Sequence, residues 1–156
     1  MQVIPSITMF LITILFTHAQ AASYALLMHP ATEEGGCLAE KKGEVILALK
    51  EGCQLTEPAS RWEKESLKEE NFLIHHVPEG MPGKCLTLLE DKVGLQNCNQ
   101  DNSRQIWKLT TNGDKVTLSS HDKCLSAVSY PKGTVVDLQD CKNADDDTLW
   151  IWKDKE

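Results

Sequence analysis

The sequence lacks the short motifs that mark the common classes of enzyme. It contains no Gly-x-Ser-x-Gly elbow, no zinc-ligand signature and no glycine-rich phosphate loop. Its paired carboxylates, such as Glu69-Glu70, lie in a charged run and not in apolar surroundings. We therefore expect a protein that is not an enzyme and that needs no cofactor.

Positive charge is also scarce. The 156 residues include 16 Lys and Arg against 23 Asp and Glu, a net charge of −7. Nucleic acids and anionic membranes both require a basic surface, so we expect neither as a partner. The sequence has no Asn-x-Ser/Thr acceptor, which predicts a chain without N-linked glycans.

Long apolar runs are absent except at the amino terminus, where Ile7 to Phe16 is too short to cross a bilayer. Small residues follow at Ala19-Gln20-Ala21, as at a signal-peptidase site. We interpret residues 1–22 as a signal peptide and residues 23–156 as one secreted domain without a membrane span. Because no Lys or Arg precedes the run, a retained signal anchor is the alternative.

Cysteine, by contrast, occurs six times and marks an internal repeat. The pattern is clearest from Lys84 to Leu109, with Cys85-Leu86, Cys98 and Trp107. Two further copies contain Cys37, Cys53 and Trp62, and Cys124, Cys141 and Trp150. In every copy the tryptophan lies nine residues after the second cysteine, and the second cysteines are 45 and 43 residues apart. This period is typical of tandem structural repeats.

Six cysteines allow many pairings, but equivalent repeats should close in the same way. We therefore predict the local bridges Cys37–Cys53, Cys85–Cys98 and Cys124–Cys141. Disulfides persist in oxidising compartments, which agrees with secretion. We expect the three tryptophans in the core, since their fixed spacing suits a symmetric structural role.

Each copy contains four apolar or alternating segments typical of short strands. The opening segments are 25–29, 72–75 and 116–118, and the others lie at Cys-Leu, before the second cysteine and at the tryptophan. Twelve strands without a convincing helix predict an all-β domain with repeats at about 24–66, 72–112 and 114–154. The first repeat is the divergent copy. It has Lys64 where the others have Leu109 and Trp152, and its Gly52 suits a β-bulge.

Three further features favour ordinary structural roles. We interpret residues 63–71 as a solvated connection between repeats. His75 and His76 are adjacent on a strand and would point to opposite faces, so we expect surface or edge histidines and no shared ion. Asp145-Asp146-Asp147 lacks the spaced ligands of a calcium loop and fits solvated acids. We expect no metal site.

Together, the Cys-Leu, Leu-Gln-x-Cys and Gln-x-Trp elements resemble the ricin-B-type lectin repeat. The segment 72–86 also resembles the amino-terminal cysteine-rich domain of the mannose-receptor family. The resemblance implies a β-trefoil of three four-stranded repeats and a role in carbohydrate binding. It covers essentially the whole mature chain.

The same resemblance implies that the galactose sites are degenerate. Galactose-binding members have an aspartate two residues after the first cysteine, an aromatic before the second, and Asn-Gln near the tryptophan. The corresponding residues here are Ala39, Thr87 and Ser126; Glu51, Gln96 and Gln139; and Ala59-Ser60, Arg104-Gln105 and Asp147-Thr148. Only Gln105 matches, and its side chain equally fits a structural role.

If one repeat keeps a glycan site, the third is the best candidate. In the mannose receptor's cysteine-rich domain, a loop tryptophan contacts sulfated sugars. Gly133 occupies the corresponding position here. Tyr130 in the same loop offers an aromatic ring on which a sugar could stack instead. We expect a site for a neutral sugar formed by Ser126, Tyr130, Gln139 and Asp147.

We thus expect a secreted, extracellular module that binds a glycan or glycoprotein. The alternatives are a lectin-derived scaffold that binds a protein receptor, and an inhibitor that binds no sugar.

Overall fold

The computed structural model describes residues 24–30, 36–79 and 83–154, and the expected signal peptide and its cleavage site lie outside them. Twelve β-strands and five single-turn 3₁₀ helices make up these residues, and no α-helix occurs among them. The strands are β1 (Ala25–His29), β2 (Gly36–Lys41), β3 (Glu44–Leu49), β4 (Trp62–Ser66), β5 (Asn71–His76), β6 (Cys85–Leu88), β7 (Val93–Gln96), β8 (Trp107–Asn112), β9 (Lys115–Ser120), β10 (Lys123–Tyr130), β11 (Gly133–Asp140) and β12 (Ile151–Asp154).

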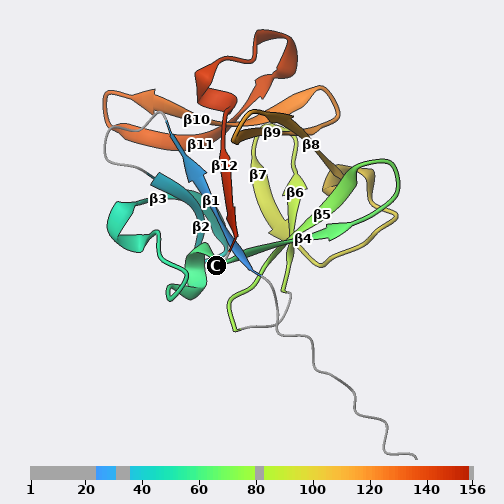
Figure 1. Ribbon diagram of the computed structural model, residues 1–156, viewed down its shortest axis with the longest axis horizontal. Helices are drawn as coiled ribbons and strands as arrows, with labels where there is room; N and C mark the ends of the chain where they lie inside the picture. The colour runs from blue at the N-terminus through green and yellow to red at the C-terminus, as the bar shows by residue number, and fades with distance from the viewer. Residues whose placement is uncertain (1–23, 31–35, 80–82, 155–156) are drawn as a thin grey trace, which may run out of the picture.

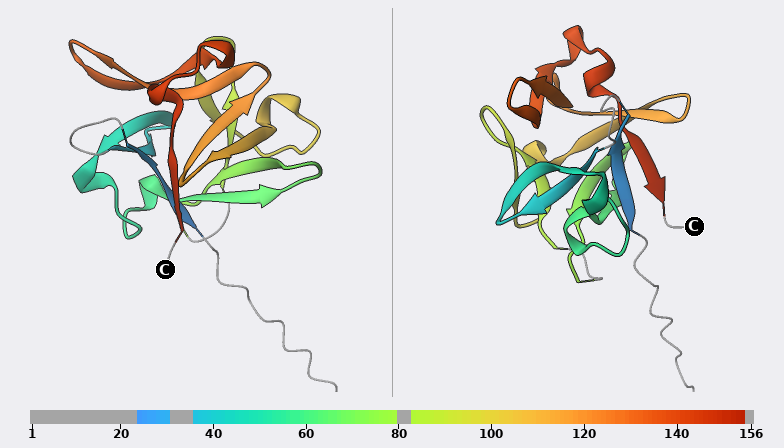
Figure 2. Two further views of the ribbon diagram at one scale, coloured as in Figure 1. Left: turned by 45° about the horizontal axis from the view of Figure 1, so that its top comes forward. Right: turned by 90° about the vertical axis from the view of Figure 1, so that its left-hand side faces the viewer.

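Each repeat contributes four consecutive strands, as the alternating pattern predicts. The second and third strands of each repeat pair as hairpins, β2–β3, β6–β7 and β10–β11. The three hairpins meet, because β3, β7 and β11 contact one another. Figures 1 and 2 show this assembly, with the β10–β11 hairpin in orange.

The first and fourth strands of the repeats form the central layer of the sheet. β1 pairs with β12, so the first and last described strands lie side by side (Figure 1). From β1 the order continues through β4, β5, β8 and β9. β9 and β12 form no ladder, and only an isolated bridge joins Val116 of β9 to Trp150, the residue before β12, so a continuous ladder does not close the sheet.

The core lies between the hairpins and the central strands. Its fully buried members include the leucine that follows the first cysteine of each repeat and the three repeat tryptophans; they are Leu38, Leu86, Leu125, Trp62, Trp107 and Trp150. Each strand contributes the side chains of one face to this core. In β9, for example, buried and half-buried residues alternate.

The three disulfides are local to their repeats. They join Cys37 to Cys53, Cys85 to Cys98 and Cys124 to Cys141, and no cysteine among the described residues is free. The all-β fold class and its three bridged repeats are therefore confirmed.

The structure differs from the sequence interpretation at three places. Gly52 does not form a bulge but ends the 3₁₀ helix η1 (Lys50–Gly52), which absorbs the extra residue of the first repeat. The charged run 63–71 is half-buried or exposed throughout, as expected for a solvated connection, but most of it forms the β4–β5 hairpin. His75 and His76 do point to different surroundings, but both are buried, at 7% and 5% exposure, because His75 packs against the Cys85–Cys98 disulfide and His76 against Trp62.

Candidate functional site

The family's aspartate positions lie beneath the surface in all three repeats. Ala39, Thr87 and Ser126 are at most 2% exposed. The Ser126 hydroxyl has no hydrogen-bond partner among the described residues. A sugar therefore cannot reach Ser126 without a rearrangement of β10, and only three of the four residues expected at the third-repeat site are accessible.

In every repeat, the side chain at the family's glutamine position forms hydrogen bonds with the backbone. It lies on a short 3₁₀ helix before each tryptophan strand: η2 (Pro58–Ser60), η3 (Ser103–Gln105) and η5 (Asp146–Thr148). Gln105 accepts a hydrogen bond from Asn99 N–H (2.8 Å) and donates to the Asn97 carbonyl (3.0 Å) and to Thr87 Oγ1 (3.1 Å). All its amide atoms are thereby engaged.

The other two copies of this position behave in the same way. The Ser60 hydroxyl lies within 3.0 to 3.2 Å of three backbone carbonyls, and Thr148 donates to the Asp145 carbonyl at 2.8 Å. Ser60, Gln105 and Thr148 are each at most 1% exposed. These three side chains fix the turn that leads into each tryptophan.

The β10–β11 hairpin places Tyr130 directly opposite Gly133, the position of the loop tryptophan in the resemblance. The Tyr130 ring is 51% exposed. Its hydroxyl donates to Asp137 Oδ2 at 3.2 Å, and this bond raises the pKa of Tyr130. Asp137 is absent from the sequence-derived set; only the hairpin register brings it to the tyrosine.

The remaining expected residues of the third repeat have other environments. Gln139 lies on β11 opposite Cys124 and is half-buried. Asp147 lies on η5, where its N–H donates to Asp145 and its carbonyl accepts from His29 Nε2 at 2.9 Å. Asp145 thus caps η5 as well as carrying charge. Within the described residues, no hydrogen bond links Ser126, Tyr130, Gln139 and Asp147 to one another.

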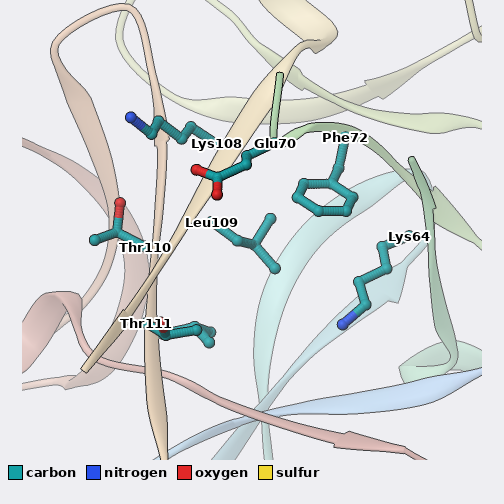
Figure 3. Close-up of a pocket in the computed structure, with 8 residues that line it drawn as sticks. Lys64, Glu70, Phe72, Lys108, Leu109, Thr110 and Thr111 are labelled. Carbon is teal, nitrogen blue, oxygen red and sulfur yellow. The ribbon is translucent and has the colours of Figure 1, made fainter. Parts of the chain in front are cut away.

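A concave feature lies between the central strands β4, β5, β8 and β9. We call this cavity of about 410 Å³ the inter-strand cavity; its lining is Lys64, Glu70, Phe72, Lys108, Leu109, Thr110, Thr111 and Val116 (Figure 3). Sequence reasoning did not find it, because its lining comes from all three repeats. The one available signal was Lys64, the charged residue at an otherwise apolar repeat position.

The inter-strand cavity combines an aromatic surface with groups of both charges. The half-buried Phe72 ring lies near Leu109 (Figure 3), and Lys64, Lys108 and Glu70 also line the cavity. Lys64 Nζ lies 4.9 Å from the centroid of the Trp152 ring, a cation–π contact. In the described part of the chain none of the three charged groups forms an ion pair within 4.0 Å.

Glu70 has an unusual backbone. It and Glu69 occupy the turn between β4 and β5 with φ values of 60° and 58°. Such left-handed conformations are costly for residues with a Cβ, and strained residues are concentrated at functional sites. The turn therefore holds the Glu70 carboxylate at the rim of the inter-strand cavity at some expense in stability.

A metal site has little support. Within the described residues the only group of three potential ligands is His75, Cys85 and Cys98, and both of its sulfurs belong to a disulfide. Nor does any helix in the described ranges have the length and apolar character to cross a membrane.

The sequence matches a family of known proteins. The family model described as ricin-type beta-trefoil lectin domain matches residues 71–156, more than half of the chain. No curated protein sequence matches.

Several solved structures have the same fold. The designed threefold symmetric protein ThreeFoil is 18% identical with a TM-score of 0.65, over 85% of this chain and 99% of that one. The Polyporus squamosus lectin bound to Neu5Acα2-6Galβ1-4GlcNAc is 15% identical (TM-score 0.64; 85% of this chain, 49% of that one). The earthworm lectin C-terminal domain mutant with 6'-sialyllactose is 11% identical (TM-score 0.62; 85% and 99%). At these identities the likeness concerns the fold alone.

Proposed function

Because the chain belongs to the ricin-type β-trefoil lectin family, we propose that it is a secreted, non-enzymatic carbohydrate-binding module whose glycan site lies in the inter-strand cavity. The observation that supports this location is the contrast between two sets of positions. The family's aspartate and glutamine positions are buried in all three repeats, whereas the inter-strand cavity has an aromatic face and charged groups that form no ion pair among the described residues.

Each part of the cavity has a counterpart in a sugar. The Phe72 ring offers an apolar face on which a pyranose can stack. Glu70 accepts hydrogen bonds from hydroxyls, and Thr110 and Thr111 both donate and accept them. Lys64 and Lys108 outnumber Glu70, so the cavity favours a glycan with a carboxylate or sulfate. Charge-assisted hydrogen bonds contribute roughly 1.5–3 kcal/mol each.

The glycans in the related structures are consistent with this choice. The Polyporus and earthworm lectins were solved with ligands that contain sialic acid, an acidic sugar. Their sequences are too different for their binding residues to be transferred. The preference proposed for this chain rests on its own lysines.

A glycan array of neutral, sialylated and sulfated ligands tests the proposal. We expect acidic glycans to bind and Lys108→Ala to weaken them by roughly 10- to 100-fold, the equivalent of one charge-assisted bond. Lys50→Ala is the matched control, because Lys50 is an exposed lysine on η1, outside the inter-strand cavity. Phe72→Leu should also weaken binding, since it removes the stacking face.

The exposed Tyr130 and its partner Asp137 favour a second location on the β10–β11 hairpin. Their neutral phenol and single carboxylate suit a neutral sugar, because the carboxylate would repel an acidic one. Tyr130→Ala in the same titrations separates the two locations. Loss of binding in Tyr130→Ala alone would contradict the inter-strand cavity, and an absence of any glycan binding would favour the protein-binding alternative.

A further inference from the structure

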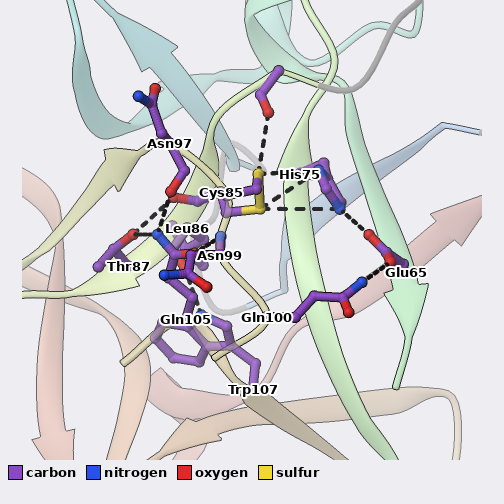
Figure 4. Close-up of a disulfide and its surroundings, with 12 residues drawn as sticks. Glu65, His75, Cys85, Leu86, Thr87, Asn97, Asn99, Gln100, Gln105 and Trp107 are labelled. Atoms are coloured by element: carbon purple, nitrogen blue, oxygen red, sulfur yellow. Dashed lines mark hydrogen bonds and ion pairs between the residues drawn. A yellow bond between two sulfur atoms is a disulfide. The ribbon is translucent and has the colours of Figure 1, made fainter. Parts of the chain in front are cut away.

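The disulfide of the second repeat has a histidine in contact with both of its sulfurs. His75 on β5 lies opposite Cys85 on β6. Its Nδ1 atom is 3.5 Å from Cys85 Sγ and 3.3 Å from Cys98 Sγ (Figure 4). The imidazole is thus within proton-transfer distance of either sulfur.

A carboxylate holds this histidine from the other side. Glu65 Oε2 on β4 lies 2.8 Å from His75 Nε2. Gln100 Nε2 donates to the second oxygen of Glu65 at 2.7 Å. The contacts therefore run from Gln100 through Glu65 and His75 to the disulfide, as Figure 4 shows. The other charged residues beside His75 are Glu63, opposite it on β4, and Lys84, just before β6.

The threefold repeat provides two internal comparisons. The residue opposite the first cysteine is Met28 for Cys37 in the first repeat and Ser119 for Cys124 in the third. Neither residue is an acid or base near neutral pH. Of the three otherwise equivalent disulfides, the one in the second repeat alone has an imidazole at this position.

The two sulfurs of this disulfide also differ in accessibility. Cys98 is an exposed residue, whereas Cys85 is 0% exposed. The second cysteines of the other repeats, Cys53 and Cys141, are half-buried and therefore less exposed than Cys98. An incoming thiolate would reach Cys98, and Cys85 would be the leaving group. A buried thiolate at Cys85 is costly, and protonation to the thiol removes this cost. The adjacent His75 is placed to supply the proton.

We propose that Cys85–Cys98 is a thiol-exchange site for a small thiol or dithiol. The thiolate of the incoming molecule attacks Cys98 Sγ and forms a new S–S bond as the Cys85–Cys98 bond breaks. The bonding electron pair goes to Cys85 Sγ, and His75 Nδ1 donates a proton there. Solvent, which took the proton of the incoming thiol, returns one to His75. The products are a mixed disulfide at Cys98 and a thiol at Cys85.

The surrounding turn is built to retain its shape during this reaction. The neighbours of Cys98, Asn97 and Asn99, are hydrogen-bonded through their backbone to the buried Gln105. These bonds do not depend on the disulfide. Cys98 can therefore carry a bound thiol while the turn stays attached to the core. Glu65 is a positioning residue, which holds the imidazole and balances its positive charge.

The test uses the intact protein and reduced glutathione. Samples quenched with an alkylating reagent at successive times are mapped by mass spectrometry. We expect the second-repeat disulfide to open first, with glutathione on Cys98 and the alkyl group on Cys85. Equal opening rates for the three disulfides, an earlier opening of another, or glutathione on Cys85 would overturn the proposal.

Three variants separate the histidine from the exposure of Cys98. His75→Met introduces the first repeat's own residue and should slow opening of Cys85–Cys98 by roughly 100-fold, the lower range for a positioned acid. The Cys37–Cys53 and Cys124–Cys141 rates serve as controls within the same molecule. An unchanged rate in a correctly bridged His75→Met protein would show that exposure alone explains the reactivity.

Glu65→Gln and Met28→His keep the proposal testable if His75→Met does not fold. Glu65→Gln should shift the pH profile of Cys85–Cys98 opening toward lower pH, because the imidazolium loses its counter-charge. Met28→His should speed the opening of Cys37–Cys53, since it places an imidazole opposite Cys37. An unshifted profile together with an unchanged Cys37–Cys53 rate would refute the acid role of the histidine.

Discussion

At the scale of single residues, the repeat tryptophans connect two parts of each motif. Each indole Nε1–H donates to the carbonyl of the leucine that follows the first cysteine, at 2.8 or 2.9 Å. The pairs are Trp62 with Leu38, Trp107 with Leu86, and Trp150 with Leu125. An unsatisfied buried carbonyl is expensive, which explains why Cys-Leu and the tryptophan occur together in every copy.

Loss of these rings should destabilise the domain. Trp107→Ala is expected to lower the free energy of unfolding by about 3–5 kcal/mol, because the side chain is fully buried. Trp62→Ala should cost less, since its repeat has the exposed Lys64 in place of the half-buried Leu109. Urea unfolding of both variants measures the difference. Equal losses, or a larger loss for Trp62→Ala, would show that the first repeat is not the looser copy.

Two buried histidines follow the same threefold pattern. His29 at the end of β1 contacts the Asp147 carbonyl, and His76 at the end of β5 contacts the Ala59 carbonyl at 3.1 Å. The third copy of this position is Ser120, whose buried hydroxyl finds no hydrogen-bond partner among the described residues. Burial lowers the pKa of both His29 and His76.

These lowered pKa values predict a loss of stability in acid. The unfolded chain binds protons at the ordinary histidine pKa of about 6.5, whereas the folded chain binds them only at lower pH. The stability contributed by the neutral rings is present above about pH 6.5 and falls as the pH decreases toward the folded values. Unfolding free energies at a series of pH values should therefore decrease below neutrality.

His76→Ser provides the control for this pH effect, because serine is the natural residue of the third copy. The variant should be less stable at neutral pH but should show a shallower decrease in acid. An unchanged slope would assign the pH dependence to other groups.

At the scale of elements, the β4–β5 turn stores strain that its sequence does not relieve. Glu69 and Glu70 both have positive φ, where glycine is favoured. Glu69→Gly should stabilise the protein by roughly 1 kcal/mol, since it removes the left-handed penalty on one residue. Thermal or urea unfolding measures the change. A loss of stability would mean that the Glu69 side chain makes a compensating contribution.

The same turn distinguishes strain from function. Glu69 does not line the inter-strand cavity, whereas Glu70 does. Glu69→Gly should therefore leave glycan binding unchanged, and Glu70→Gln, which keeps the backbone strain, should alter it. This pair assigns any effect on binding to the carboxylate and not to the turn.

At the scale of the whole molecule, the expected export of the chain depends on residues outside the described ranges. We predict cleavage near Ala21 or Ala22, which would leave a mature domain that begins just before β1. Amino-terminal sequencing of protein from the culture medium is the measurement. An uncleaved chain held in the membrane would instead support the signal-anchor alternative.

Within the whole domain, the repeat pattern was enough to predict the all-β class and its three bridged units, and the resemblance to the ricin-B-type repeat implied their β-trefoil arrangement. The cysteine and tryptophan spacings identify three equivalent units, and equivalent units must bridge and pack alike, which gives the local disulfides. Alternating apolar residues then assign one face of each strand to the core. These features are periodic within each repeat, so the sequence determined them by itself.

The binding surfaces were decided by tertiary structure alone. The inter-strand cavity joins Lys64 and Glu70 to Lys108 and Leu109 across two repeats, and Asp137 reaches Tyr130 only through the hairpin register. The contacts of His75 with Glu65 and the disulfide depend on three adjacent strands. A sequence pattern records neighbours along one strand, whereas such sites arise where strands from distant parts of the chain meet.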